Sequence, residues 1–245
     1  MKKLIIALLF AMPAAVMAAG AGVHLDKADI DLSDNASLQR GAKLFVNYCL
    51  SCHSAAYQRY NRMGQDIGLT DDQIKDNLML AGEKVGDTMT IAMPRGDAKR
   101  WFGNPPPDLS VTSRSRGSDW IYTYLKTFYV DESRPFGMNN AVFPDVGMPH
   151  VLWELEGQKK AVTKTEVDAD GNETTVITGY EMVKAGSMSE AEYDQAALDL
   201  TAFMTYMGEP VQLKRQQIGI WVLLFLAIFF VVAYALKKEY WKDVH

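Results

Sequence analysis

The segment that can do chemistry is Cys49-Leu50-Ser51-Cys52-His53, which holds both cysteines of the 245-residue chain. Two thiols three positions apart, followed at once by a histidine, form the C-x-x-C-H pattern of c-type haem attachment. The thiols reach the two vinyl groups of one porphyrin, and the histidine becomes an axial ligand of the iron. We therefore expect one covalently bound haem c held by Cys49, Cys52 and His53.

Two other uses of this motif compete with haem. A thioredoxin-like dithiol needs a βαβ context, and half of a zinc site needs a second pair of ligands. A chain with two cysteines and four histidines offers few residues for such a pair. The motif therefore favours haem over both alternatives.

The other face of the iron needs a sixth ligand. A methionine thioether there raises the haem potential, which suits electron transfer, whereas an open position suits gas binding or catalysis. Of the 13 methionines, Met93 and Met148 each precede a proline that fixes a loop, and Met138 is a third candidate. Residue types alone do not choose among these three.

Two segments can position the haem motif. Residues 37–48 repeat apolar side chains at helical spacing and lead into the motif, with Gly41 where another helix can approach closely. Ser189 and Glu192 form a capping box that opens a second helix, which ends at Gly208. This pair resembles the crossed first and last helices of class I cytochromes c. We therefore expect a mainly α, class I cytochrome c-like haem domain.

Further elements are expected as insertions between these helices. A capping box at Thr70 and Gln73 opens one short helix, and Ser118 opens another. Strand-like runs at residues 161–167 and 174–178 flank a turn-rich segment, which predicts a β-hairpin decorating the helical domain.

Both ends of the chain carry apolar segments. Residues 1–18 begin with Lys2 and Lys3, continue through a short apolar run and reach small residues near Ala18. This layout is typical of a secretory signal peptide, with an uncleaved anchor as the alternative. Residues 218–236 are 19 uncharged and mostly apolar residues without a polar face, enough for a helix to cross about 30 Å of hydrocarbon.

These segments divide the chain into four parts. We expect a signal peptide over residues 1–18, a haem domain over 19–213, a transmembrane helix over 214–236 and a tail over 237–245. Because a signal peptide directs export of the polypeptide behind it, the haem domain is predicted on the periplasmic side of a bacterial inner membrane and the tail in the cytoplasm.

The exported part is acidic. The two ends hold seven of the 25 basic and two of the 30 acidic side chains, which leaves 18 bases against 28 acids and a net charge of −10. This balance argues against nucleic acid as a partner. An acidic surface can steer a basic diffusing partner toward the membrane, or it can simply keep the domain soluble.

Three further segments resemble the cytochrome c1 family, the haem subunits of the cytochrome bc1 complex (ubiquinol–cytochrome c oxidoreductase). They are GNPPPDLS at 103–110, RSR at 114–116 and NAVFPDVGMP at 140–149. Together with the apolar C-terminal segment they occur in family order, and the likeness runs from the haem motif to the tail. The resemblance implies that Cys49 and Cys52 hold the haem, that His53 is the proximal ligand and that Met148 is the distal ligand.

The resemblance also assigns an arginine. It places Arg116 near the haem propionates, where a guanidinium pairs with a carboxylate and tunes the potential. Arg114 is the fallback, and solvent-facing positions for both arginines are the alternative. The run of prolines at 105–107 is expected to form rigid extended backbone that lines the haem, or else a stiff loop.

The family implies a function in the respiratory chain. The chain would accept one electron from the Rieske iron–sulfur protein and pass it to a c-type cytochrome, as an electron-transfer subunit that is no enzyme on its own. Its partners would be cytochrome b, the Rieske protein, the acceptor cytochrome and membrane lipid. The alternatives are a membrane-tethered carrier cytochrome, the haem subunit of a terminal oxidase, and a haem sensor or enzyme with an open sixth position.

Overall fold

The computed structural model describes residues 23–167 and 173–243. The signal peptide predicted for residues 1–18 lies outside the described residues and stays a prediction.

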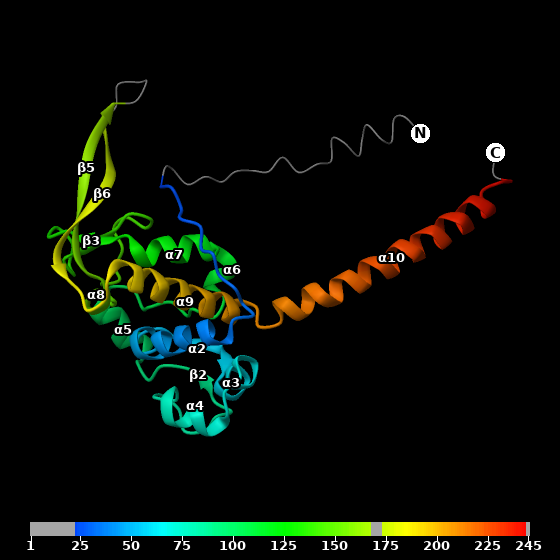
Figure 1. The fold of residues 1–245 in the computed structure, drawn as a ribbon, viewed down its shortest axis with the longest axis horizontal. Coiled ribbons are helices and arrows are strands. Elements are labelled where there is room, and N and C mark those ends of the chain that lie inside the picture. Colours follow the sequence, from blue (N-terminus) through cyan, green and yellow to red (C-terminus); the bar gives the residue numbers. More distant parts are fainter. Residues whose placement is uncertain (1–22, 168–172, 244–245) are drawn as a thin grey trace.

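Two neighbouring helices form the centre of the domain (Figure 1). Helix α2 spans Asn35–Leu44 and continues as a short π-helix, η1, over Phe45–Cys49, so the haem motif begins at its last residue. Helix α9 spans Glu190–Gly208 and opens with the capping box of Ser189 and Glu192. Both predicted helices are therefore confirmed, and the first one reaches Cys49 through a change of helical pitch.

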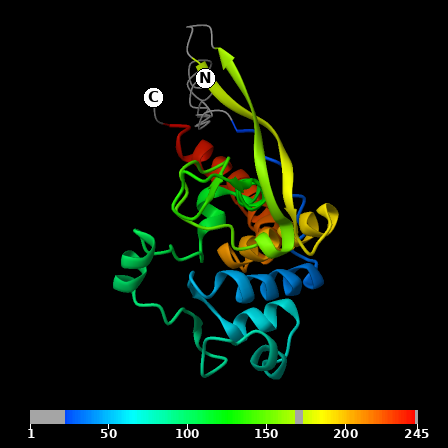
Figure 2. The same ribbon diagram turned by 90° about the vertical axis from the view of Figure 1, so that its left-hand side faces the viewer.

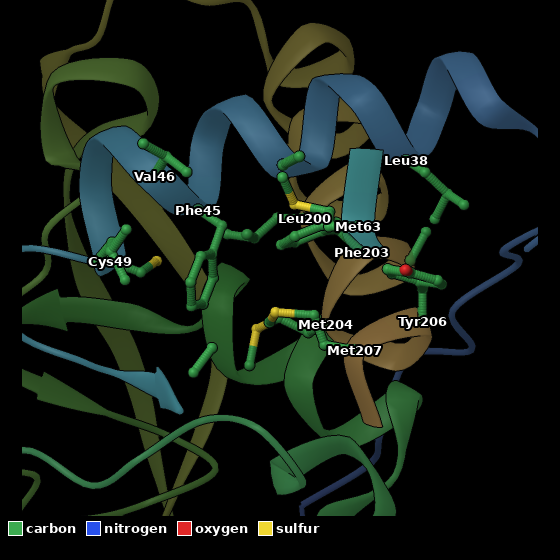
Figure 3. Packing of buried hydrophobic residues seen from close by; sticks show 14 of the residues in the cluster. Leu38, Phe45, Val46, Cys49, Met63, Leu200, Phe203, Met204, Tyr206 and Met207 are labelled. Carbon is green, nitrogen blue, oxygen red and sulfur yellow. The ribbon is translucent and has the colours of Figure 1, made fainter. Parts of the chain in front are cut away.

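The core lies where these helices meet (Figure 3). Phe45, the first residue of η1, packs against Phe203 of α9, with ring centroids 5.6 Å apart and both side chains fully buried. Leu38 of α2 and Leu200 of α9 belong to the same buried cluster. Removing this much apolar surface from water is the main force that holds the two helices together.

Short elements follow the haem motif. Thr70 and Gln73 form the predicted capping box at the start of the helix Asp71–Asn77. Two short strands in this region, Ala55–Arg59 and Thr88–Met89, pair antiparallel. The elements are β1 (Ala55–Arg59), α3 (Tyr60–Ile67), α4 (Asp71–Asn77), β2 (Thr88–Met89) and α5 (Arg95–Phe102).

A second group of elements packs beside α9. The helix that was predicted to begin at Ser118 does so, and the two short strands after it pair antiparallel. The group consists of α6 (Thr112–Arg116), α7 (Ser118–Lys126), β3 (Phe128–Val130), β4 (Met138–Asn140) and α8 (Trp153–Glu156).

The predicted β-hairpin is present and is longer than expected. Strands β5 (Gly157–Val167) and β6 (Glu173–Ala185) pair antiparallel and stand away from the helices (Figure 2). Lys159 and Lys184 lie in the part that the sequence pattern missed. Because this ribbon exposes most of its described side chains, it needs no alternation of apolar residues, and the pattern underestimates its length.

The last helix, α10, spans Gln212–Tyr240 and leaves the domain on its own (Figure 1). Within the described residues it is the one helix that is long and apolar enough to cross a membrane, and none of it is buried against the rest of the chain. The segment predicted as membrane-spanning, 214–236, lies inside it. The helix continues for four residues into the predicted tail.

Candidate functional site

The haem motif lies in a tight turn at the end of η1. The backbone amide of Cys52 donates to the carbonyl of Cys49 over 3.0 Å, and the amide of His53 donates to the same oxygen over 2.8 Å. Cys49 is buried and Cys52 partly exposed, and no disulfide joins them. Burial, with a smaller contribution from Cys52, raises the pKa of the Cys49 thiol to about 12. The turn therefore presents two cysteine side chains and an imidazole from one short segment.

His53 is held by the proline-rich loop. Its Nδ1 lies 2.7 Å from the backbone carbonyl of Pro107. A carbonyl oxygen can only accept, so Nδ1 carries the proton and the lone pair is on Nε2, for which the described part of the chain offers no hydrogen-bond partner. Burial lowers the pKa of His53 and so favours the neutral ring. A neutral imidazole with one nitrogen fixed by a carbonyl is how a histidine is prepared as an iron ligand.

The loop after Pro107 is fastened to the chain that comes after the motif. The amide of Leu109 donates to the carbonyl of Ser54 over 2.8 Å, and the Asp108 carboxylate accepts from the amide of Ala56 over 2.9 Å. Residues 105–107 have no helix or strand structure. The run of prolines therefore supports the expected proximal ligand through the Pro107 carbonyl.

Met148 lies on a different part of the domain. It packs, partly buried, against a small second cluster formed by Phe128, Met138 and Val146. Its Sδ accepts a hydrogen bond from the Tyr124 hydroxyl over 3.3 Å. The ring of Tyr124 packs on both this cluster and the main one, to which Cys49 belongs.

The other two candidate methionines differ from Met148 in their surroundings. Met138 is buried within β4 as part of the second cluster. Met93 is partly buried just before α5, and no polar donor among the described residues contacts its sulfur. Of the three, Met148 is the one whose sulfur is held by a hydrogen bond.

The two arginines of the RSR segment have different environments. Arg116 lies over the ring of Trp120, 5.1 Å from its centroid, and 5.9 Å from that of Phe143, and it makes no ion pair with any described residue. Arg114 lies 3.7 Å from a carboxylate oxygen of Glu209, which also binds Arg215. Arg116 is therefore available to an anion, whereas Arg114 is engaged at the junction of α9 and α10.

Sequence reasoning missed a group of polar residues behind Met148. His150 is stacked on Phe128 with ring centroids 4.9 Å apart, and its Nε2 lies 2.8 Å from the Glu156 carboxylate. Lys159 also pairs with Glu156. His150 and Glu156 are buried and Lys159 is partly buried, and together they anchor the end of the loop that carries Met148. Only the aromatic residues at positions 120, 124 and 128, four apart, signal this region in the sequence.

A cleft among the described residues lies elsewhere. It measures about 900 Å³ and lies at the base of the β5–β6 hairpin. Its lining includes Lys126, Glu156, Lys159, Tyr180 and Asp194, and none of the predicted haem residues.

The crossed α2 and α9 helices, the C-x-x-C-H turn and the free Nε2 of His53 define the class, a c-type cytochrome haem domain followed by an apolar helix. The sequence model of the cytochrome C1 family matches residues 27–89 and 76–244. The chain belongs to the cytochrome c1 family.

Relatives that match most or all of the chain support this membership. Cytochrome c1 of Allochromatium vinosum is 52% identical over 100% of both chains. The ammonia monooxygenase gamma subunit of Nitrosomonas europaea is 48% identical over 100% of this chain and 98% of its own. The mitochondrial cytochrome c1 heme protein of Saccharomyces cerevisiae is 24% identical over 86% of this chain and 68% of its own.

Proposed function

We propose that this chain accepts one electron from the Rieske iron–sulfur protein of a cytochrome bc1 complex and passes it to a c-type cytochrome. The observation that carries the proposal is the contact between Nδ1 of His53 and the Pro107 carbonyl, which leaves Nε2 available to bind iron. Full-length similarity to a bacterial cytochrome c1 supports the assignment to this complex.

Each proposed site residue has a separate task. The thiols of Cys49 and Cys52 would hold the haem through two C–S bonds, each made by addition of S–H across a vinyl group, with the thiol proton going to carbon. His53 and Met148 would ligate the iron, and Arg116 would pair with a propionate. When bound, the haem supplies a one-electron iron couple. The chain's residues fix the orientation of the haem and the potential of this couple.

The membrane arrangement is part of the proposal. Helix α10 spans the inner membrane, where it contacts lipid and cytochrome b, and the haem domain lies on the periplasmic side. The exposed apolar length of α10 supports this arrangement, because so much apolar surface is stable only in a bilayer or against other apolar helices.

The relative named as an ammonia monooxygenase subunit gives a second candidate, an association with a monooxygenase. Purification of the full chain from detergent-solubilised membranes, through a C-terminal tag, distinguishes the two. We expect a cytochrome b and an iron–sulfur protein to copurify, and quinol to reduce the haem in the purified complex. Copurified monooxygenase subunits would instead support the second candidate, and a haem protein that purifies alone would support a tethered carrier.

A matched control tests the membrane part. A chain truncated before Gln212 keeps α2 and α9 and lacks α10. We expect it to be released as a haem protein that no longer copurifies with cytochrome b. Retention of cytochrome b by the truncated chain would contradict the role given to α10.

A further inference from the structure

The hydroxyl of Tyr124 has one partner, and it is a sulfur. It donates to Sδ of Met148 over 3.3 Å, and the described residues offer it no other hydrogen bond. This hydrogen bond is partly buried. A phenolic O–H is a donor and a thioether sulfur is a weak acceptor, so the hydroxyl acts directly on that sulfur.

The ring of Tyr124 is fixed in this orientation. Trp120, one helical turn earlier on α7, stacks on it with centroids 5.0 Å apart and ring planes 11° apart. Phe128 meets it edge-on, also at 5.0 Å, with the planes 72° apart. The side-chain amide of Asn140 donates to the Tyr124 carbonyl over 2.8 Å and so holds the backbone of α7 against β4. The contacts with Trp120, Phe128 and Asn140 therefore keep the Tyr124 hydroxyl directed at Met148.

A thioether sulfur has two lone pairs. One can accept the O–H donor while the other faces a metal, and the donor then does two things. It removes a rotational freedom of the methionine side chain, and it withdraws electron density from the sulfur, which weakens donation to the ferric ion and favours the ferrous state. Second-shell hydrogen bonds to an axial ligand tune haem potentials by this kind of effect.

We propose that Tyr124 is a positioning residue that holds the Met148 thioether toward the iron and raises the haem potential through its O–H···S hydrogen bond. This inference rests on the proposed function, in which Met148 is the distal ligand.

The test is the substitution Tyr124→Phe in the full-length holoprotein, since phenylalanine keeps the ring contacts with Trp120 and Phe128 and removes only the hydroxyl. The control is Tyr122→Phe on the same helix, whose hydroxyl binds Asp194 and Lys126 and has no contact with Met148. Redox titration of the haem gives the potential, and the absorption band of the ferric iron–thioether bond reports the ligand itself.

We expect Tyr124→Phe to lower the equilibrium constant for reduction by up to about tenfold, equivalent to about 59 mV for a one-electron couple. The ferric iron–thioether band should shift or weaken in the same variant. Tyr122→Phe should change the equilibrium constant by less than about twofold, which is below about 20 mV by the same conversion. An unchanged potential in Tyr124→Phe, or an equal shift in both variants, overturns the role of Tyr124.

A third variant, Met148→Ala, separates this result from the ligand assignment. If Met148 is the ligand, this variant loses the ferric iron–thioether band and binds carbon monoxide readily when reduced. If the band persists and carbon monoxide stays excluded, Met148 is not the ligand, and both the assignment and the inference fail. If the band is lost but Tyr124→Phe behaves like its control, only the inference about Tyr124 fails.

Discussion

Gly41 of α2 lies directly against the backbone of Asp199 on α9. A Cβ added at Gly41 would be 2.1 Å from the Asp199 carbonyl oxygen and 2.7 Å from Cβ of Phe203. Only a residue without a side chain lets the two helices cross at this distance. The crossing brings Cys49, about two helical turns further along, into the buried core, so this contact helps to fix the position of the haem motif.

Gly41→Ala is therefore expected to destabilise the domain. Overpacking against backbone costs about 3 kcal/mol, and the better helix propensity of alanine offsets about 1 kcal/mol, for a net loss of about 2 kcal/mol. Urea unfolding of the solubilised holoprotein, followed by haem absorbance, measures the loss. Gly96→Ala in α5 is the control, because its Cβ meets open space. A Gly41 variant as stable as the Gly96 variant would contradict the close crossing.

The same helix pair is joined by a buried carboxylate. Asp199 is 2% exposed and accepts hydrogen bonds from Ser37 over 2.7 Å and from Arg40 Nε over 2.6 Å. Asp199→Ala leaves these donors without their acceptor. Because Arg40 is half exposed and can turn to water, we expect a loss of about 2 kcal/mol, below the value for a fully buried pair.

The control for Asp199 is the exposed pair of Asp97 and Arg100 on α5, which has a similar distance of 2.8 Å. Asp97→Ala is expected to change stability by less than about 0.5 kcal/mol. Urea unfolding of both variants gives the comparison. Equal losses of unfolding free energy in the two variants would mean that burial of the Asp199 carboxylate does not increase its contribution to stability.

The loop between β3 and β4 predicts a dependence on pH. Hydrogen bonds from the Ser133 hydroxyl and from the Asn139 side chain lower the pKa of Asp131 in the folded chain. A lowered folded pKa means that this carboxylate contributes stability above its unfolded pKa of about 3.9, and that the contribution is lost as pH falls through the folded value.

The variant Asp131→Asn isolates this contribution from those of the other carboxylates. Unfolding free energies of the two proteins between pH 6 and pH 3 should differ most at pH 6 and converge on acidification. Curves that stay parallel over this range would show that Asp131 titrates alike in the folded and unfolded chain.

The net charge of −10 in residues 19–213 predicts a dependence on salt. We expect electron transfer from the haem to a basic soluble c-type cytochrome to slow by about tenfold or more as ionic strength rises from about 0.01 to 0.15 M, because the screening length falls from about 30 to 8 Å. Stopped-flow kinetics measures the rate, and an uncharged small oxidant serves as the control. A rate that is flat or rises with salt for the basic partner would refute electrostatic steering.

Local patterns in the sequence predicted the parts of the fold that depend on neighbouring residues. Short continuous segments are enough to recognise the haem motif, the capping boxes at Thr70 and Ser189, and the apolar length of α10. Gly41 was also predicted, because a glycine within a helical pattern implies a close neighbour. Assignment of Met148 needed the family resemblance, and its role as a ligand stays a prediction.

The contacts that shape the site were not predictable in this way. Pro107 binds His53 from 54 positions away, and Tyr124 reaches Met148 across 24. Such pairs depend on tertiary packing, which leaves no periodic signal in one sequence. The paired strands β2 and β4 have two and three residues, too short for an alternating pattern. Helix α10 extends beyond the apolar segment at both ends. Lysine and arginine are good helix formers, so the helix continues where charged residues replace apolar ones.

Only three residues separate the end of α9 at Gly208 from the start of α10 at Gln212, and Glu209 among them binds both Arg114 and Arg215. Three residues span at most about 10 Å. In the proposed arrangement, with α10 in a bilayer, this short junction would hold the haem motif at a nearly constant height above the lipid. Any large movement that brings an electron donor or acceptor close to the haem would then be made by the partner protein.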